Sequence, residues 1–483
     1  MPGLILLAIV IAATAFIIPA NWLDSTSPAF LLLIGVIGMW RYSWGLIHFC
    51  RAMLYRHIVF PRMRRRVEAL GEDALPSHVY LLLTTFRVAQ STTERVYRAA
   101  IEEALACRIP CTLVASIVEL ADRQIITRLY NTMAAGSDMR LVIVRIPGTG
   151  KRDALADGFR AIAADRPARD AAVCVIDGDT ILEPGLLRSS LPFLKANPRA
   201  GAFTTDEICE VEGRRVFRDW YNMRFAQRQI LMSSMGLSRR VLTLTGRMSA
   251  FRAEVACDPR FIAMVQEDHI DHWLFGRLKF LTGDDKSTWF YLLRGGFEML
   301  YIPDVRIRTV EHPPHPDFGI ASTQLMVRWF GNMLRTNSRA LALGPGRMGL
   351  FTWWCVLDQR ISMWTSLTGL AAALIVAASG QPWLFFGYLY WVAITRLILT
   401  VLLLTVRNNV SWTYPFLLYY NQIYGSLIKI YMLFNLDRQR WTRQNTTLPR
   451  NHHSSERFWT LVGSRAGHVA SMLLLFVVIG EII

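Results

Sequence analysis

Long stretches without charged residues occupy both ends of the chain and enclose a middle that carries most of the charge. Residues 1–23 contain no charged side chain, and neither do residues 361–390. Further apolar stretches cover residues 28–50, 383–406, 412–434 and 466–480. These lengths are near the roughly 20 residues that a helix needs to cross a bilayer core. Because no basic residues precede the first stretch and a second follows at once, we expect a retained N-terminal transmembrane hairpin over residues 1–50 rather than a signal peptide.

The composition indicates a soluble domain between these membrane segments. Hydrophobic residues make up 52% of the chain and charged residues 19%, which is too apolar for an ordinary soluble enzyme and too charged for a bare helix bundle. We therefore expect an α/β domain over residues 51–350, with interfacial helices, inserted between N-terminal and C-terminal transmembrane helices. Residues 351–483 would form the C-terminal membrane region.

Basic residues predict the orientation in the membrane. Six arginines follow the second apolar stretch directly: Arg51, Arg56, Arg62, Arg64, Arg65 and Arg66. The loop around Asp24 has no Lys or Arg. Positive residues stay on the cytoplasmic side, so the middle of the chain should be cytoplasmic. The formal net charge of +16 also suits an anionic substrate or product. Nucleic acid is not expected as a partner, because the arginines cluster beside membrane segments.

The C-terminal region holds two further charge signals. The arginine-rich residues 437–465 should also be cytoplasmic, which requires 412–434 to lie in the interface or bend back rather than cross fully. Arg396 lies inside the apolar stretch 383–406. It either snorkels to the membrane surface or faces a water-filled path through the membrane.

The middle of the chain alternates between strand and helix patterns. Strands are expected at residues 79–85, 111–118, 141–145 and 172–177, with helices at 91–106, 122–135 and 152–164. This alternation predicts a mostly parallel sheet with helices on both faces. Ligands of such sheets bind beyond the carboxyl ends of the strands.

The strongest chemical motif follows the last of these strands. Asp177 and Asp179 flank one glycine where the apolar run 173–176 ends. Two carboxylates at a strand end suit a divalent cation that bridges the diphosphate of a nucleotide sugar, with Mg²⁺ expected and Mn²⁺ as the alternative. A plain Asp-Gly turn is the structural alternative. Upstream, Lys151 stands at a helix start and is either a diphosphate contact or a solvated charge.

Two further motifs follow downstream. Asp284 and Asp285 form a Gly-Asp-Asp turn in which adjacent carboxylates raise each other's pKa, so one suits a general base; a surface acidic turn is the alternative. Gln324 and Arg328 share a helix face beside Trp329, a combination that suits phosphate and a sugar ring or an ordinary interfacial helix. Glu267, Asp268, His269 and His272 form a weaker zinc candidate, whose histidines would lie three apart on a helix.

The order of these motifs resembles the processive, inverting family 2 glycosyltransferases, such as cellulose, chitin and hyaluronan synthases, over roughly residues 78–445. The resemblance implies a GT-A-like fold and assigns roles by motif. Asp177 and Asp179 match the metal and diphosphate motif, Asp285 the general base, and Gln324, Arg328 and Trp329 the acceptor and diphosphate motif. Lys151 matches a basic substrate contact, and Trp441 with Arg443 resembles a gating-loop motif.

Longer matches narrow the resemblance to the catalytic subunit of bacterial alginate (mannuronan) synthase. They are residues 281–289, 326–333, 419–425 and 437–444. The resemblance implies GDP-mannuronic acid as donor, β-1,4-linked polymannuronate as product, and an inner-membrane location. It also implies a cyclic di-GMP-binding co-polymerase subunit and periplasmic export proteins as partners. One departure is the first strand end, Thr84–Arg87, where relatives carry a Pro-Thr-Tyr-Asn-Glu-like turn; Glu119 or Asp122 would then serve as the acidic nucleotide contact.

Two alternatives remain from the sequence. A related synthase would use a neutral or N-acetylated sugar from another nucleotide. A transporter or scaffold that has lost activity would carry damaged aspartate motifs, and here both motifs are intact.

Overall fold

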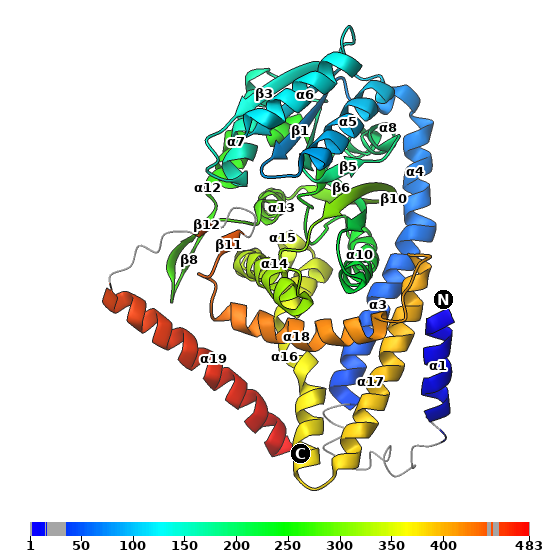
Figure 1. Ribbon diagram of the computed structural model, residues 1–483, viewed down its shortest axis with the longest axis vertical. Coiled ribbons are helices and arrows are strands. Elements are labelled where there is room, and N and C mark those ends of the chain that lie inside the picture. The colour runs from blue at the N-terminus through cyan, green and yellow to red at the C-terminus, as the bar shows by residue number, and fades with distance from the viewer. Residues whose placement is uncertain (1, 15, 17–34, 442–445, 448–453, 483) are drawn as a thin grey trace.

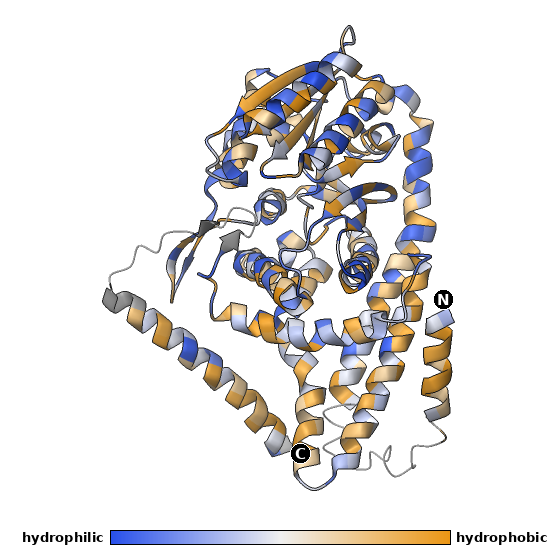
Figure 2. Ribbon diagram, in the orientation of Figure 1, coloured by the Kyte–Doolittle hydropathy of each residue, from blue (hydrophilic) through white to orange (hydrophobic). Residues whose placement is uncertain are grey.

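The computed structural model describes residues 2–14, 16, 35–441, 446–447 and 454–482. An α/β domain forms one end of the molecule, and the most apolar helices form the other (Figures 1 and 2). This separation follows from the sequence, because the uncharged stretches have no polar face to present to water.

One mixed sheet organises the α/β domain. Its eight strands run in the order β3-β2-β1-β4-β7-β6-β10-β5. The strands are β1 (Val79–Thr85), β2 (Cys111–Ile117), β3 (Arg140–Arg145), β4 (Ala172–Asp177), β5 (Thr180–Leu182), β6 (Ala200–Val211), β7 (Met248–Arg252) and β10 (Glu298–Glu311). The first four strands of that order are parallel, as predicted, whereas β7 and β5 run antiparallel to their neighbours. All seven residues of β1 are buried, since helices cover both faces of the sheet (Figure 1).

The helices of this domain connect the strands and line the site. They are α5 (Gln90–Cys107), α6 (Leu120–Met133), α7 (Lys151–Ala164), α8 (Leu186–Ser190), α9 (Pro192–Ala196), α10 (Arg215–Gly236), α11 (Ala253–Ala256), α12 (Pro259–Glu267), α13 (Asp284–Gly295), α14 (Phe318–Leu341) and α15 (Gly344–Met348). A short hairpin of β8 (His269–His272) and β9 (Gly276–Lys279) follows α12. The three helices predicted between β1 and β4 therefore form at α5, α6 and α7.

The zinc interpretation of the stretch at Glu267 is wrong. His269 and His272 lie on strand β8 rather than on a helix, and residues three apart on a strand point to opposite faces. The Asp268 carboxylate is instead held by two hydrogen bonds of 2.5 Å from the guanidinium of Arg339. Among the residues that the structure describes, no group of three or more His, Cys, Asp or Glu could hold a metal.

A long helical rod joins the N-terminal region to the sheet. It comprises α3 (Ile37–Leu54), a π-helical segment (Tyr55–Val59) and α4 (Phe60–Ala69). The π-helical segment turns Tyr55 inward, where its hydroxyl donates to the carbonyl oxygen of Tyr301 over 2.6 Å. Gly236 on α10 allows this approach, because a Cβ there would lie 2.7 Å from the Tyr55 ring. These contacts fix the rod to the α/β domain at β10 and α10.

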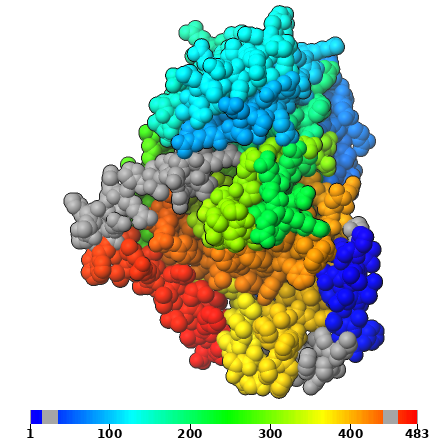
Figure 3. Space-filling model, viewed as in Figure 1, coloured from blue at the N-terminus to red at the C-terminus, as the bar shows by residue number. Residues whose placement is uncertain are grey.

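Three helices of the described chain are long and apolar enough to cross a membrane: Leu350–Ala378, Pro382–Thr405 and Phe458–Glu481. They correspond to α16 (Leu350–Ala378), α17 (Pro382–Leu402) with the 3-10 turn that follows it (Leu403–Thr405), and most of α19 (Ser454–Ile482). The first predicted segment appears as α1 (Pro2–Thr14), a shorter apolar helix. The space-filling view has α1 and α19 on opposite sides of the molecule (Figure 3).

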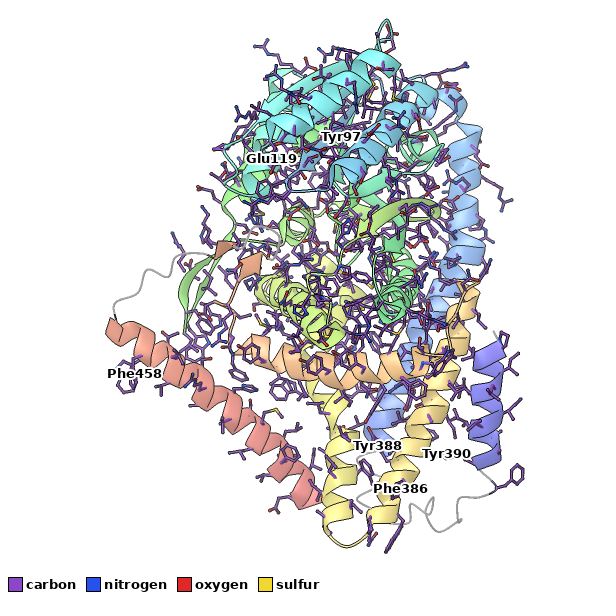
Figure 4. All side chains as sticks on the ribbon, viewed as in Figure 1. Tyr97, Glu119, Phe386, Tyr388, Tyr390 and Phe458 are labelled. Atoms are coloured by element: carbon purple, nitrogen blue, oxygen red, sulfur yellow. The ribbon has the colours of Figure 1, made fainter. Side chains whose placement is uncertain are left out.

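Helix α18 (Tyr414–Leu433) lies across α16 and α17 instead of running beside them (Figure 1). It contacts α16 and α17 as well as α10 and α14 of the domain. Tyr388 of α17 lies between these helices (Figure 4), with its hydroxyl 3.3 Å from that of Tyr419 on α18. Arg396 is also buried and donates a hydrogen bond to the side-chain oxygen of Gln422 on α18, so its guanidinium points into the helix bundle.

Candidate active site

A cavity of about 560 Å³ lies at the carboxyl ends of the parallel strands. Its wall includes most of the residues that the sequence singled out: Lys151, Asp177, Asp179, Asp284, Asp285, Arg328 and Trp329. Gln324 lies on the same helix, α14, but is not part of this wall. Backbone from four separate parts of the chain therefore brings the three motifs to one space.

The Asp177-Gly178-Asp179 turn stands where the parallel half of the sheet ends. Asp177 is paired with Thr84 of β1, and its amide donates to the carbonyl oxygen of Arg247 over 3.1 Å. On the other side, the carbonyl oxygen of Asp179 accepts from Val310 on β10 over 2.8 Å. A Cβ on Gly178 would lie 2.6 Å from the carbonyl oxygen of Thr84. Only glycine fits between the carboxylates, and the two backbone hydrogen bonds hold the turn in place.

Lys151 connects the two aspartate motifs. Its Nζ lies 2.6 Å from Oδ1 of Asp177 and 3.0 Å from Oδ2 of Asp284. Burial alone would lower the pKa of Lys151, but the two carboxylates outweigh burial and raise it. Gly246 leaves room for this contact, since a Cβ there would lie 3.1 Å from Nζ. Lys151 is thus a charged, fixed group at the centre of the site rather than a solvated side chain.

The two adjacent aspartates have different environments. Gly283 starts the turn with φ of +86°, which favours glycine, and Asp284 and Asp285 open helix α13. Burial acts to raise the pKa of Asp284, yet the charges of Lys151 and Arg152 hold it below the ordinary value. Burial and the charge of Asp284 raise the pKa of Asp285. Asp284 therefore holds its negative charge more readily than Asp285, and Asp285 is the better proton acceptor.

The side-chain contacts of the two aspartates differ as well: Asp285 accepts from a neutral hydroxyl group, and Asp284 pairs with an ammonium group. Oδ2 of Asp285 accepts a hydrogen bond of 3.2 Å from the Thr243 hydroxyl, whereas Asp284 is engaged by Lys151. A carboxylate in a cavity with a raised pKa suits proton transfer.

Arg152, which forms a basic pair with Lys151 in the sequence, supports the Gly-Asp-Asp turn from inside the domain. The Arg152 guanidinium is buried and donates to the carbonyl oxygens of Val265 and Thr282, over 2.7 and 3.0 Å. Its Nη2 also lies 3.1 Å from the Ser287 hydroxyl on α13. The one sequence feature that pointed to Arg152 was the basic pair that it forms with Lys151. Such a pair at a helix start is also typical of solvated charge.

Trp329 forms an aromatic wall of the cavity. Its ring stacks on Trp220 of α10, with ring centres 5.6 Å apart and planes at 24°. Asn332, one turn later on α14, accepts a 2.8 Å hydrogen bond from the Thr282 hydroxyl. Helix α14 is therefore tied to the turn that holds Asp285, so the aromatic wall and the carboxylate keep a fixed relation.

The segment with the gating-loop motif, Trp441 and Arg443, begins close to the Gly-Asp-Asp turn. Gln439 is buried; its side-chain oxygen accepts from the amide of Leu281 over 3.0 Å, and its side-chain nitrogen donates to the carbonyl oxygen of Lys279 over 2.8 Å. Trp441, two residues later, belongs to β11 (Arg440–Trp441), which pairs with β12 (Thr446–Thr447). The prediction for Arg443 lies outside the described residues.

The two candidates for the acidic nucleotide contact differ in burial, and neither belongs to the cavity wall. Glu119 is exposed on the flank of the domain (Figure 4). Asp122 is buried, and burial raises its pKa to about 6. Thr84–Arg87 and Val118 do line the cavity, at its β1 and β2 end.

The divalent cation expected at Asp177 and Asp179 fits the residues present. Both are oxygen donors on a rigid turn and both line the cavity. Mg²⁺ and Mn²⁺ sites of this kind take one or two carboxylates, with substrate phosphates and water completing the shell.

Comparisons with known proteins point in one direction. The family model described as "Glycosyltransferase like family 2" matches residues 76–332. The protein named Glycosyltransferase alg8 from Pseudomonas syringae pv. tomato is 49% identical over 448 residues, which are 93% of this chain and 91% of that protein. The protein of the same name from Azotobacter vinelandii is 50% identical over 452 residues, or 94% and 92% of the two chains.

One solved structure to which the chain is similar is that of a mannosyltransferase from Pyrobaculum calidifontis in complex with GDP-Man and Mn²⁺. It has a TM-score of 0.43 and 16% sequence identity. The match covers 82% of this chain and 98% of that one.

Proposed function

Because the chain belongs to the family 2 glycosyltransferases, we propose that it polymerises GDP-mannuronic acid into β-1,4-linked polymannuronate, the precursor of alginate. The observation that carries the proposal is the meeting of Lys151, the Asp177/Asp179 turn, Asp285 and Trp329 in one cavity. The donor sugar follows from the likeness to the alg8 glycosyltransferases and from the family resemblance of the sequence.

The reaction is a single displacement at the anomeric carbon of the donor. Asp285 accepts the proton of the acceptor 4-hydroxyl group. At the same time the oxygen of that hydroxyl group forms the new bond to the anomeric carbon of the donor. The bond from the same carbon to the diphosphate breaks, and GDP leaves with the bonding electrons. Trp329 offers a flat apolar face for the acceptor ring, which holds the hydroxyl near Asp285 and so reduces the entropic part of the barrier.

The leaving diphosphate needs positive charge beside it. Family membership suggests a divalent metal as cofactor, and we propose Mg²⁺ held by Asp177 and Asp179; it would neutralise charge on the departing GDP. Lys151, which two carboxylates hold in place, and Arg328 provide cations on the same wall. Gln324 and Trp441 would contact the acceptor chain from α14 and from the segment that follows α18.

The membrane arrangement completes the proposal. We propose an inner-membrane location with the α/β domain in the cytoplasm, supported by the arginines that follow Leu54 along the helical rod. The crosswise course of α18 supports an interfacial position for residues 414–433. The growing chain would leave through the C-terminal helices. From the resemblance alone, a cyclic di-GMP-binding subunit would activate synthesis and export proteins would receive the polymer.

Membranes that contain the protein provide the test. They are incubated with radiolabelled GDP-mannuronate and, in parallel, with labelled UDP-glucose, UDP-N-acetylglucosamine and UDP-glucuronate. Label should enter polymer from GDP-mannuronate alone, and membranes with Asp179→Ala should incorporate none. Incorporation from a UDP-sugar, with none from GDP-mannuronate, would overturn the donor assignment while leaving the glycosyltransferase fold intact.

A further inference from the structure

A buried hydroxyl without a partner marks one part of the cavity wall. Tyr221 on α10 is 1% exposed and lines the cavity. Its hydroxyl makes no hydrogen bond to any residue that the structure describes. Leaving a buried polar group unpaired is unfavourable, which points to a ligand as the partner.

Next to this hydroxyl lies a cation that also has no acidic partner. Arg224 follows Tyr221 by one turn of α10, and its guanidinium lies 4.3 Å from the ring centre of Trp329 and 5.0 Å from that of Trp220. Within the described ranges, no carboxylate forms an ion pair with Arg224. Burial lowers its pKa to about 10. The neighbouring Arg247 is different, because Glu311 and Glu207 pair with it at 2.5 and 3.3 Å.

A second such cation approaches from the membrane side. Lys429 on α18 lies 4.9 Å from the ring centre of Phe330, the residue after Trp329. Burial and the charge of Arg224 lower its pKa to about 8. The acid that acts on Lys429, Asp358, is engaged by Arg41 through hydrogen bonds of 2.7 and 2.9 Å. Like Arg224, Lys429 forms no ion pair in the described part of the chain.

Two cations without a carboxylate partner are unfavourable in a poorly solvated space, and the charge of Arg224 adds to the cost of keeping Lys429 protonated. They come from α10 and α18, which contact each other, and α18 also contacts α14 (Figure 1). The arrangement becomes favourable when an anion binds. Of the three groups, Tyr221 lines the cavity, together with Trp329, over which Arg224 lies. The donor diphosphate is assigned to the Asp177/Asp179 end, so an anion beside Trp329 must have another source.

We propose that Tyr221, Arg224 and Lys429 form a carboxylate-binding site for the acceptor end of the polymer, beside Trp329. The site rests on the proposed function, in which every acceptor sugar carries a carboxylate. The hydroxyl donates to one carboxylate oxygen, and the two cations neutralise the charge. A neutral sugar would leave all three groups unpaired, so the site selects uronate chains against neutral ones.

The test measures acceptor preference and donor turnover separately. Oligomannuronate and its carboxyl-reduced, neutral form are added to membranes, and elongation of each is measured at limiting concentration. The wild type should elongate the charged acceptor at least tenfold better, since charge-assisted hydrogen bonds contribute about 1.5–3 kcal/mol. Arg224→Gln and Lys429→Gln should each reduce this ratio about tenfold, and Arg224→Lys should restore part of it. Arg218→Gln, an exposed arginine on the same helix, is the matched control and should keep the wild-type ratio.

A donor readout separates this site from the diphosphate site. The concentration of GDP that halves the activity should be the same in Arg224→Gln as in the wild type. An equal loss of GDP and acceptor affinity would mean that Arg224 binds the diphosphate, and would overturn the proposal. An unchanged preference for the charged acceptor in both Gln variants would also overturn it. A wild-type protein that releases no GDP from GDP-mannuronate would refute the proposed function itself, and the carboxylate site with it.

Discussion

The adjacent aspartates of the Gly-Asp-Asp turn offer a sharp prediction, because the structure gives them different tasks. Asp285→Asn keeps the size of the side chain and an oxygen that can accept from Thr243, 3.2 Å away. It removes the group that takes the proton. Loss of a general base slows a reaction about 10²- to 10⁴-fold, which is about 3–5 kcal/mol on the barrier. Folding should be nearly unaffected, since the change also removes a charge beside Asp284.

Asp284→Asn should act mainly on stability. It removes the negative charge from the 3.0 Å contact with Lys151, and Lys151 keeps only Asp177 as an ionic partner. The two side chains are 13% and 18% exposed, so the loss is that of one charged hydrogen bond, about 1.5–3 kcal/mol, rather than that of a fully buried ion pair.

The assay compares both variants with the wild type in detergent. Initial polymer rate, GDP affinity and apparent melting temperature are measured for each. Asp285→Asn should lose rate with GDP affinity and melting temperature unchanged, whereas Asp284→Asn should melt at a lower temperature. A polymer rate for Asp285→Asn within tenfold of the wild type would refute the general-base assignment. Rate loss in Asp284→Asn alone would mean that the two roles are reversed.

Four further predictions follow from the site and from the helix bundle. Chelation of divalent metal should abolish polymer synthesis in the wild type, and added Mg²⁺ should restore it there but not in Asp179→Ala; full activity in excess chelator would contradict the metal site. Asp285 must be deprotonated to act, and its pKa is raised by burial, so kcat/KM should fall as pH drops through a value above the ordinary Asp pKa of about 3.9. Thr243→Ala removes a hydrogen bond that lowers this pKa, and should move that acidic limb to higher pH; an unmoved limb would assign it to another group. Arg396→Gln should release GDP at the wild-type rate but yield shorter polymer, measured by size-exclusion chromatography, if Arg396 faces the exit path; polymer of equal length and amount would contradict this role.

Much of the sheet domain could be predicted from sequence, because its signals are local. The buried run Val79–Thr85 and the run that ends at Asp177 are short, apolar and followed by helix patterns, so strands β1 and β4 formed as predicted. The carboxyl ends of parallel strands meet at one edge, which explains why the motif at Asp177 lies in the cavity. The long strands β6 and β10 and the antiparallel β7 were not predicted, since their pairing depends on residues far away in the sequence.

The site was predicted in its parts but not in its connections. Nothing near Lys151 in sequence reveals that its ammonium group bridges Asp177 and Asp284. The stacking of Trp220 on Trp329 joins two helices that are distant in the chain. At His269 the predicted secondary structure was wrong. The sequence was interpreted as a helix, but Ile270 pairs with Leu278 across a hairpin, so the segment is a strand.

The central claim is that this one cavity adds uronic acid residues, one at a time, from GDP-mannuronate. The most direct test is mass spectrometry of the products that the purified protein makes from GDP-mannuronate, Mg²⁺ and a short oligomannuronate, together with whatever activating subunit it needs. A ladder of products spaced by one anhydro-uronic acid residue is expected from the wild type, and no ladder is expected from Asp285→Asn. No extension of the acceptor, or a ladder that persists in Asp285→Asn, would contradict it.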